Sequence, residues 1–363
     1  MSIDFSTWVR PELLSLKPYA SARTIAAGTK DPVDLSANEN PWPVDATCPL
    51  NRYPDPQPPE LVAALANHYR IDPARLLITR GSDEGIDLLN RLLVRPGKDG
   101  VMVNSPCFGM YALYATIQGA KVVDVPAVEG QSGWAMDWPA VNKAPECRLY
   151  FFCSPNNPTG HTLNPVDVLA FAKRVESHGV VVIDEAYVEF GQSDSMASLI
   201  DHQPNLVVLR TLSKAFGLAG ARLGAVIAHP DLIAWLKRII APYPLPTPSV
   251  DAALHALSPK ALAQQETQLA SLANNKARLV EALSAMPTIE RLWPGEANFV
   301  LIKVADADAL MRHCLADGIR LRNQSHQPKL DQAIRITVGT DEETLRLIDS
   351  LQRFDAQNKS IKD

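Results

Sequence analysis

The sequence predicts an α/β fold: a doubly wound, mainly parallel sheet in a large domain, followed by a smaller α+β domain. Along the first part of the chain, short apolar runs alternate with amphipathic helical patterns, which is typical of parallel β-α-β units. Several runs are apolar at every position, as strands covered by helices on both faces should be. We expect these strands at residues 76–79, 101–104, 121–125, 148–152, 180–184 and 206–210.

The helices between these strands are recognised by their ends. Residues 165–177 follow Asn164 as an N-cap, begin with Pro165, whose backbone angle suits a first turn, and stop before Gly179. Apolar residues recurring at helical spacing predict further helices at 59–69, 82–93 and 230–240.

We expect five segments along the chain. The first is irregular and rich in Pro and Asn, the small domain shows strands and helices in the order β-α-β-β-α, and the polar end of the chain should fray. The segments are an N-terminal arm at 1–58, a large domain at 59–250, a connecting helix at 251–286, the small domain at 287–354 and a tail at 355–363.

The composition excludes several classes of protein. The 363 residues are 46% hydrophobic and carry a net charge of -5, so the excess of positive charge that nucleic acids demand is missing. No uninterrupted apolar stretch is long enough to span a membrane, and the N-terminus lacks the apolar core of a signal peptide. The five cysteines show neither disulfide nor zinc spacing. We therefore expect a cytoplasmic protein that binds neither nucleic acid nor membrane.

Common catalytic motifs are also missing from the sequence. There is no G-x-G-x-x-G after a strand for a dinucleotide and no G-x-x-x-x-G-K-[ST] for a nucleoside triphosphate. The histidines show no metal-binding spacing, and no G-x-S-x-G elbow occurs. We expect no metal site.

The most informative segment is 211–224, directly after an expected apolar strand. Lys214 stands among apolar neighbours, where desolvation can remove its charge and leave a free amine for Schiff-base chemistry. Ser213 and Arg222 suit a phosphate group. A lysine alone in such a loop is usually only solvated, so the prediction of Schiff-base chemistry depends on the other polar residues at this site.

Three segments that precede Lys214 in the chain place polar residues at the ends of expected strands. Asp184 ends a buried strand, at the sheet edge where parallel-sheet proteins bind ligands, and could keep a pyridine nitrogen protonated. The loop 153–160 also follows a strand, although by itself it is only rich in turn residues. The turn 80–85 opens a helix, whose backbone N–H groups attract phosphate despite the acidic side chains there. In the small domain, Arg322 and Arg335 lie near strand ends and could bind a carboxylate or a phosphate.

Together these segments resemble the fold-type I pyridoxal-phosphate aminotransferases, and within them most closely the branch that acts on histidinol phosphate. The resemblance covers nearly the whole chain. It rests on residues 18–19, 37–41, 51–55, 156–160, 184–187, 213–214, 335–339, the Gly81 turn and Arg222.

The resemblance implies a role for each matching residue. Lys214, Asp184 and Tyr187 are the expected catalytic residues: Lys214 binds pyridoxal 5′-phosphate and moves a proton, and Asp184 pairs with the ring nitrogen. Asn157 and Tyr187 are expected to hydrogen-bond the ring hydroxyl oxygen. The expected partners of the cofactor phosphate are Ser82, Asp83, Ser213, Arg222 and Tyr53, with Tyr53 reaching over from the neighbouring subunit of a homodimer.

The resemblance also implies where the substrate binds. Phe108 is the expected ring-stacking residue, although relatives often have Tyr there, so a polar role for that hydroxyl is lost. Histidinol phosphate carries a phosphate, and glutamate carries two carboxylates, so one site must bind both kinds of anion in turn. The residues expected to do so are Tyr19, Asn157, Arg322 and Arg335.

We therefore expect a ping-pong aminotransferase that interconverts histidinol phosphate plus 2-oxoglutarate with imidazole-acetol phosphate plus glutamate, in histidine biosynthesis. Two other activities on the same fold remain open, a broad aromatic aminotransferase and a threonine-phosphate decarboxylase. A regulatory module that keeps the cofactor without turnover is disfavoured, because the N-terminal arm lacks a basic helix-turn-helix pattern.

Overall fold

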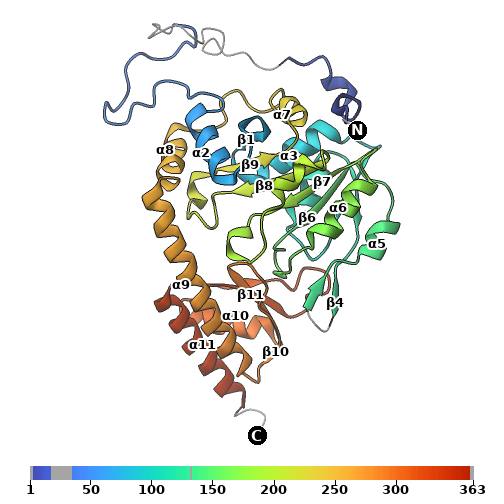
Figure 1. Cartoon of the computed structure of the whole chain (residues 1–363). Coiled ribbons are helices and arrows are strands. Elements are labelled where there is room, and N and C mark those ends of the chain that lie inside the picture. Colours follow the sequence, from blue (N-terminus) through green and yellow to red (C-terminus); the bar gives the residue numbers. More distant parts are fainter. Residues whose placement is uncertain (1–2, 18–34, 131–132, 360–363) are drawn as a thin grey trace.

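A seven-stranded sheet forms the centre of the larger part of the computed structural model, which describes residues 3–17, 35–130 and 133–359 (Figure 1). The strand order is β1-β9-β8-β7-β6-β2-β3. β9 runs antiparallel to both of its neighbours, and the other pairs are parallel. The strands are β1 (Leu76–Thr79), β2 (Gly100–Val103), β3 (Lys121–Asp124), β6 (Leu149–Cys153), β7 (Val180–Asp184), β8 (Leu206–Thr211) and β9 (Gly224–Ile227).

Helices cover both faces of this sheet. Successive residues of β7 belong to opposite cores: Val181 and Ile183 pack in one, Val180 and Val182 in the other. This two-sided burial explains why the strands are apolar at every position. The helices are α2 (Pro59–Tyr69), α3 (Gly81–Leu93), α4 (Met110–Ile117), α5 (Trp138–Lys143), α6 (Pro165–Arg174), α7 (Pro230–Leu236) and α8 (Thr247–Ala256).

A four-stranded antiparallel sheet forms the second part of the molecule, with its own core beneath its helices. Its strand order is β10-β11-β13-β12. The strands are β10 (Ile289–Trp293), β11 (Phe299–Val304), β12 (Arg322–Asn323) and β13 (Ala333–Thr337), and the helices are α9 (Pro259–Ser284), α10 (Ala307–Ala316) and α11 (Asp341–Lys359). Figure 1 shows α9 running along one side of the molecule from the large sheet to the small sheet.

Short elements complete the described chain. A hairpin of β4 (Val128–Gly130) and β5 (Gly133–Ala135) reaches the small sheet, where Trp134 contacts Trp293 at a ring-centroid distance of 6.2 Å. The 3-10 helices are η1 (Phe5–Thr7), η2 (Pro11–Leu13), η3 (Pro73–Arg75), η4 (Val188–Phe190), η5 (Met196–Asp201) and η6 (Ala219–Ala221). None of the helices in the described ranges is both long and apolar enough to cross a bilayer.

The expected elements differ from the structure at several places. Helices α4 and α5 were not expected, and of the helix expected at 230–240 only Pro230–Leu236 is α-helical. The expected connecting helix at 251–286 is two helices, because Ser258 caps a new helix: its Oγ accepts the Ala261 N–H at 3.4 Å. The antiparallel β9, the hairpin and β10 were not expected, because β9 and the hairpin strands are short and β10 carries two adjacent charges, Glu290 and Arg291. The expected tail from residue 355 is helical as far as Lys359, so that expectation is wrong for these residues.

Asp355 explains why α11 continues. The residue is buried, and its Oδ1 accepts the Thr288 N–H at 3.0 Å just before β10. We expect Asp355→Ala to lower the free energy of unfolding by about 1 kcal/mol or more, because a buried backbone donor loses its acceptor. Urea denaturation would measure this. Asp349→Ala is the control, since Asp349 forms only an exposed ion pair with Arg353 on the same helix; equal effects of the two changes would contradict the prediction.

Candidate active site

The sequence-predicted residues come together in a pocket at the C-terminal edge of the large sheet. β6, β7 and β8 are parallel and end side by side there, and α3 begins beside them. This is the edge at which open parallel sheets bind ligands. Nine predicted residues line the pocket: Ser82, Asp83, Phe108, Asn157, Asp184, Tyr187, Ser213, Lys214 and Arg222.

Asp184 is the buried acid of the site. It is the last residue of β7; its Oδ2 accepts the Tyr111 hydroxyl at 2.7 Å and its Oδ1 accepts the Ala186 N–H at 3.0 Å. Burial nevertheless raises the pKa of Asp184 to about 6. Within the described residues no cation lies within ion-pair distance of this carboxylate. A protonated ring nitrogen is the kind of group that would compensate it.

Lys214 lies in the loop that joins β8 to the antiparallel β9. The residue stays open to solvent on one side, while its Nζ lies 5.7 Å from the centre of the Tyr187 ring. Desolvation, and then the nearby Arg335, lower the pKa of Lys214. A lowered pKa increases the fraction of free amine, which is the nucleophilic form.

The start of α3 and Arg222 form an anion site. The first backbone N–H groups of a helix have no helical partner and attract anions. Arg222 Nη1 lies 3.4 Å from Ser213 Oγ, and Nη2 lies 3.4 Å from Asp83 Oδ2. Gly81 has φ +76°, and a Cβ there would lie 2.8 Å from Arg222 Nη2, so the turn needs glycine. These groups fit the phosphate of the cofactor.

Asn157 links the pocket to the two arginines of the small sheet. Its Oδ1 accepts a hydrogen bond from Arg335 Nη1, which leaves the amide NH₂ as a donor for another group. Arg322 stands directly opposite Arg335 in the β12–β13 ladder. Burial, and then Arg322, lower the pKa of Arg335. Two arginines that stand opposite each other, one of them bonded to a pocket residue, favour an anionic ligand.

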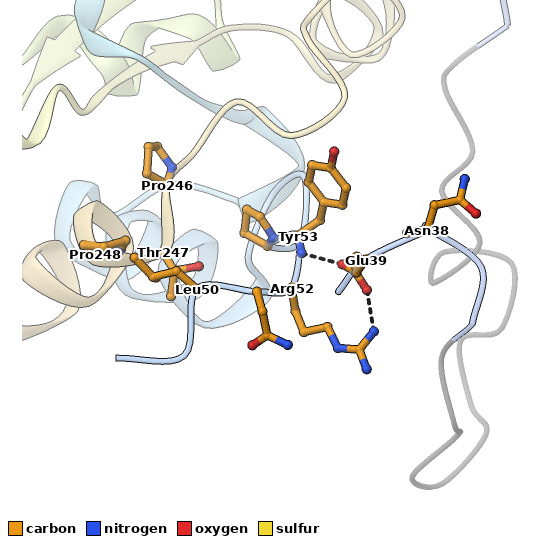
Figure 2. Close-up of a pocket in the computed structure, with 11 residues that line it drawn as sticks. Asn38, Glu39, Leu50, Arg52, Tyr53, Pro246, Thr247 and Pro248 are labelled. Atoms are coloured by element: carbon orange, nitrogen blue, oxygen red, sulfur yellow. Dashed lines mark hydrogen bonds and ion pairs between the residues drawn. The ribbon is translucent and has the colours of Figure 1, made fainter. Parts of the chain in front are cut away.

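Three described residues of the prediction do not line this pocket: Arg322 and Arg335, which belong to the small sheet, and Tyr53. Tyr53 is half exposed in a separate cleft between the N-terminal segment and the start of α8 (Figure 2). Its ring stacks on Tyr243 at a centroid distance of 4.4 Å, and its backbone N–H donates to Glu39 Oε1 at 2.6 Å. Tyr19 lies outside the described residues.

The sequence analysis missed one residue of the site. Tyr111 is fully buried on α4, stacks on Phe151 at 5.1 Å and donates to Asp184. In the sequence, the one indication of this role is that Tyr111 stands three residues after Phe108. In the structure the two rings meet edge-on, with their centroids 5.6 Å apart. In the described ranges no group of three or more His, Cys, Asp or Glu is placed to hold a metal ion.

This site, with a lysine and an uncompensated aspartate at strand ends and an anion site at a helix N-terminus, defines a fold-type I pyridoxal-phosphate-dependent enzyme. The family model "Aminotransferase class I and II" matches residues 27–351. The chain therefore belongs to the class I and II aminotransferases, and its cofactor is pyridoxal 5′-phosphate.

Two relatives that match nearly the whole chain support this assignment to the aminotransferases. The chain is 43% identical over 353 residues to a histidinol-phosphate aminotransferase of Stenotrophomonas maltophilia (strain R551-3), covering 96% of both chains. It is 44% identical over 350 residues to that of Xanthomonas campestris pv. campestris (strain 8004), covering 95% of this chain and 96% of the relative.

A solved structure supports the fold and the cofactor. The histidinol-phosphate aminotransferase of Sinorhizobium meliloti, in complex with pyridoxal-5′-phosphate, superposes with a TM-score of 0.74 at 27% identity. The match covers 84% of this chain and 83% of that chain.

The raised pKa of Asp184 leads to a prediction for the apoprotein. In the unfolded chain this carboxyl has the ordinary pKa of 3.8. Below about pH 3.8 it is protonated in both states, so burying it costs no charge. Between about pH 3.8 and pH 6 the cost of burying the charge grows, and above pH 6 it is constant. Asp184→Asn should therefore raise the free energy of unfolding by up to about 3 kcal/mol at about pH 8. Near pH 4 the two apoproteins should be equally stable.

Urea denaturation of both apoproteins at several pH values would measure this difference. Saturating cofactor should reverse the order at pH 8, because only the carboxylate can pair with a ring nitrogen cation. A stability difference that does not depend on pH would contradict the prediction.

Proposed function

We propose that the chain transfers an amino group between L-histidinol phosphate and 2-oxoglutarate, forming imidazole-acetol phosphate and L-glutamate by a ping-pong mechanism in histidine biosynthesis. The observation that carries this proposal is the Arg322–Arg335 pair, which is joined to the cofactor pocket by the hydrogen bond from Arg335 to the pocket residue Asn157. The names of relatives that match over nearly the full chain support the same substrate.

We assign each residue of the pocket its own role in the reaction. When bound, pyridoxal phosphate supplies an aldehyde that bonds amines and a ring that accepts electrons. The lowered pKa of Lys214 favours the free amine, which would bind the aldehyde and, once the substrate amine has displaced it, would take the proton from the substrate Cα. Asp184 would pair with the protonated ring nitrogen, and Asn157 and Tyr187 would donate to the ring oxygen. Phe108 offers its ring face for stacking.

The substrates share one anion site in turn. Arg335 and Arg322 can hold the phosphate of histidinol phosphate in one half-reaction and a carboxylate of glutamate in the other, because a guanidinium group fits either. Asn157 already contacts Arg335, so it orients that arginine. We assign Tyr19 to the same anion site because of its position in the family motif.

We further propose a cytoplasmic homodimer in which Tyr53 completes the partner's site. Two observations support this. Tyr53 lies in its own cleft and lines no part of the cofactor pocket of its own subunit. None of the five cysteines forms a disulfide, as expected in a reducing compartment.

A single half-reaction tests the substrate and the role of Lys214. Cofactor-loaded enzyme should rapidly lose its lysine-bound absorbance band with histidinol phosphate and respond far more slowly to phenylalanine. Lys214→Ala should abolish turnover while cofactor still binds, because no amine remains to move the proton. Equal conversion of phenylalanine would instead indicate a broad aromatic aminotransferase, and turnover by the variant would refute the role of Lys214.

The anion site gives a second test. Arg322→Ala should raise KM for histidinol phosphate and for glutamate by about tenfold or more, the effect of losing a charged hydrogen bond. A neutral aromatic substrate should be affected much less. Arg320→Ala is the matched control, since Arg320 is an exposed arginine two residues away. Steady-state kinetics would measure these changes in KM. An equal rise in KM for all substrates would contradict the assignment of Arg322 to the anion site.

A further inference from the structure

The loop between β10 and β11 of the small sheet contacts two loops of the large sheet through one residue, Glu296. Its backbone N–H donates to Gly160 O at 2.7 Å. Its Oε2 accepts the Gln192 N–H at 3.0 Å, and its Oε1 accepts the Thr162 hydroxyl at 3.3 Å. A single carboxylate therefore connects both loops to the small sheet.

Each of these loops carries a residue of the cofactor site. Gly160 closes the turn that contains Asn157, since its N–H donates to Asn156 O at 2.7 Å. Gln192 follows η4, which begins directly after Tyr187. A displacement of either loop would therefore move Asn157 or Tyr187 relative to the ring of the cofactor.

The segment around Glu296 packs closely against both loops of the large sheet. A Cβ on Gly160 would lie 2.7 Å from Gly295 Cα, and a Cβ on Gly191 would lie 2.7 Å from Glu296 Oε2. Lys276 of α9 donates to the carbonyl oxygens of Gly295 and Ala297, each at 2.7 Å. The backbone on either side of Glu296 is thus held in place, and its carboxylate has little room to move.

Phe299, which begins the next strand, contacts Tyr187 and Arg335, the arginine that donates to Asn157. Its ring lies edge-on to Tyr187 at 5.3 Å, and the Arg335 guanidinium carbon lies 5.3 Å from the ring centre. The segment from Glu296 to Phe299 therefore borders the cofactor site, although none of its residues lines the pocket.

We propose that Glu296 is a positioning residue that aligns Asn157 and Tyr187 with the ring oxygen of the cofactor. The proposal rests on the proposed roles of those two residues. Hydrogen bonds weaken steeply as their geometry departs from linear, so a small shift of either loop has a large effect on them. Donors to the ring oxygen stabilise its negative charge most when the neighbouring lysine nitrogen is unprotonated. Misalignment should therefore raise the pH at which that nitrogen loses its proton.

The test is a spectroscopic pH titration of the cofactor-loaded protein without substrate, together with the dissociation constant of the cofactor. Glu296→Ala should move the midpoint to higher pH and weaken cofactor binding about fivefold, as expected for one lost hydrogen bond. Glu296→Gln keeps one acceptor oxygen and should fall between this variant and the wild type. Glu290→Ala, which removes an exposed carboxylate from β10, should change neither quantity.

Other outcomes would overturn the proposal. A lower thermal stability with an unchanged midpoint and dissociation constant would make Glu296 a structural residue only. A Glu296→Ala shift that persists in an Asn157→Ala, Tyr187→Phe background would show that it does not act through these residues. If Glu296→Ala does not fold, Thr162→Val, which removes one donor and leaves the carboxylate, must shift the midpoint in the same direction.

The titration also separates this proposal from the proposed substrate. No substrate is added, so the midpoint is independent of whether the enzyme acts on histidinol phosphate. An unchanged midpoint in Asn157→Ala alone would remove the residue roles on which the proposal rests, and the proposal with them.

Discussion

The site depends on a buried carboxylate at the edge of the large sheet that has no cation within ion-pair distance among the described residues. Asp184 is tolerated there because the Tyr111 hydroxyl and the Ala186 N–H donate to it, yet these two hydrogen bonds do not offset its desolvation. In the proposed function, the ring nitrogen of the cofactor supplies the missing positive charge. The protein would then hold an unfavourable charge in advance and recover its cost when the cofactor binds.

The rest of the pocket follows from the direction of the strands. Because β6, β7 and β8 are parallel, their last residues meet at one edge, and the loops after them carry the reactive groups. The turn into the antiparallel β9 brings Arg222 back over the start of α3, beside Lys214. Ser213 and Arg222 of the anion site and the amine of Lys214 thus come from a single loop, and the start of α3 completes the anion site.

The proposed anion site is joined to the proposed cofactor site by contacts between the two sheets. Arg335 belongs to the small sheet and Asn157 to the large one, and they are joined by a hydrogen bond. Glu296 and Phe299 add contacts from the small sheet to the loops around Asn157 and Tyr187. The cofactor residues and the anion-binding residues are therefore aligned by packing between two bodies of the molecule.

Local patterns in the sequence were enough to predict the strands at 76–79 and 180–184 and the helix at 59–69, because two-sided burial and caps are properties of neighbouring residues. The residues that line the pocket were named chiefly from the family resemblance of their motifs, which are also short segments of the chain. The role of Tyr111, the burial of Asp355, the direction of β9 and the contacts of Glu296 were decided by the tertiary structure alone. Each of these joins residues far apart in the chain, and their partners are chosen by how helices and sheets pack. No spacing along the sequence encodes that packing directly.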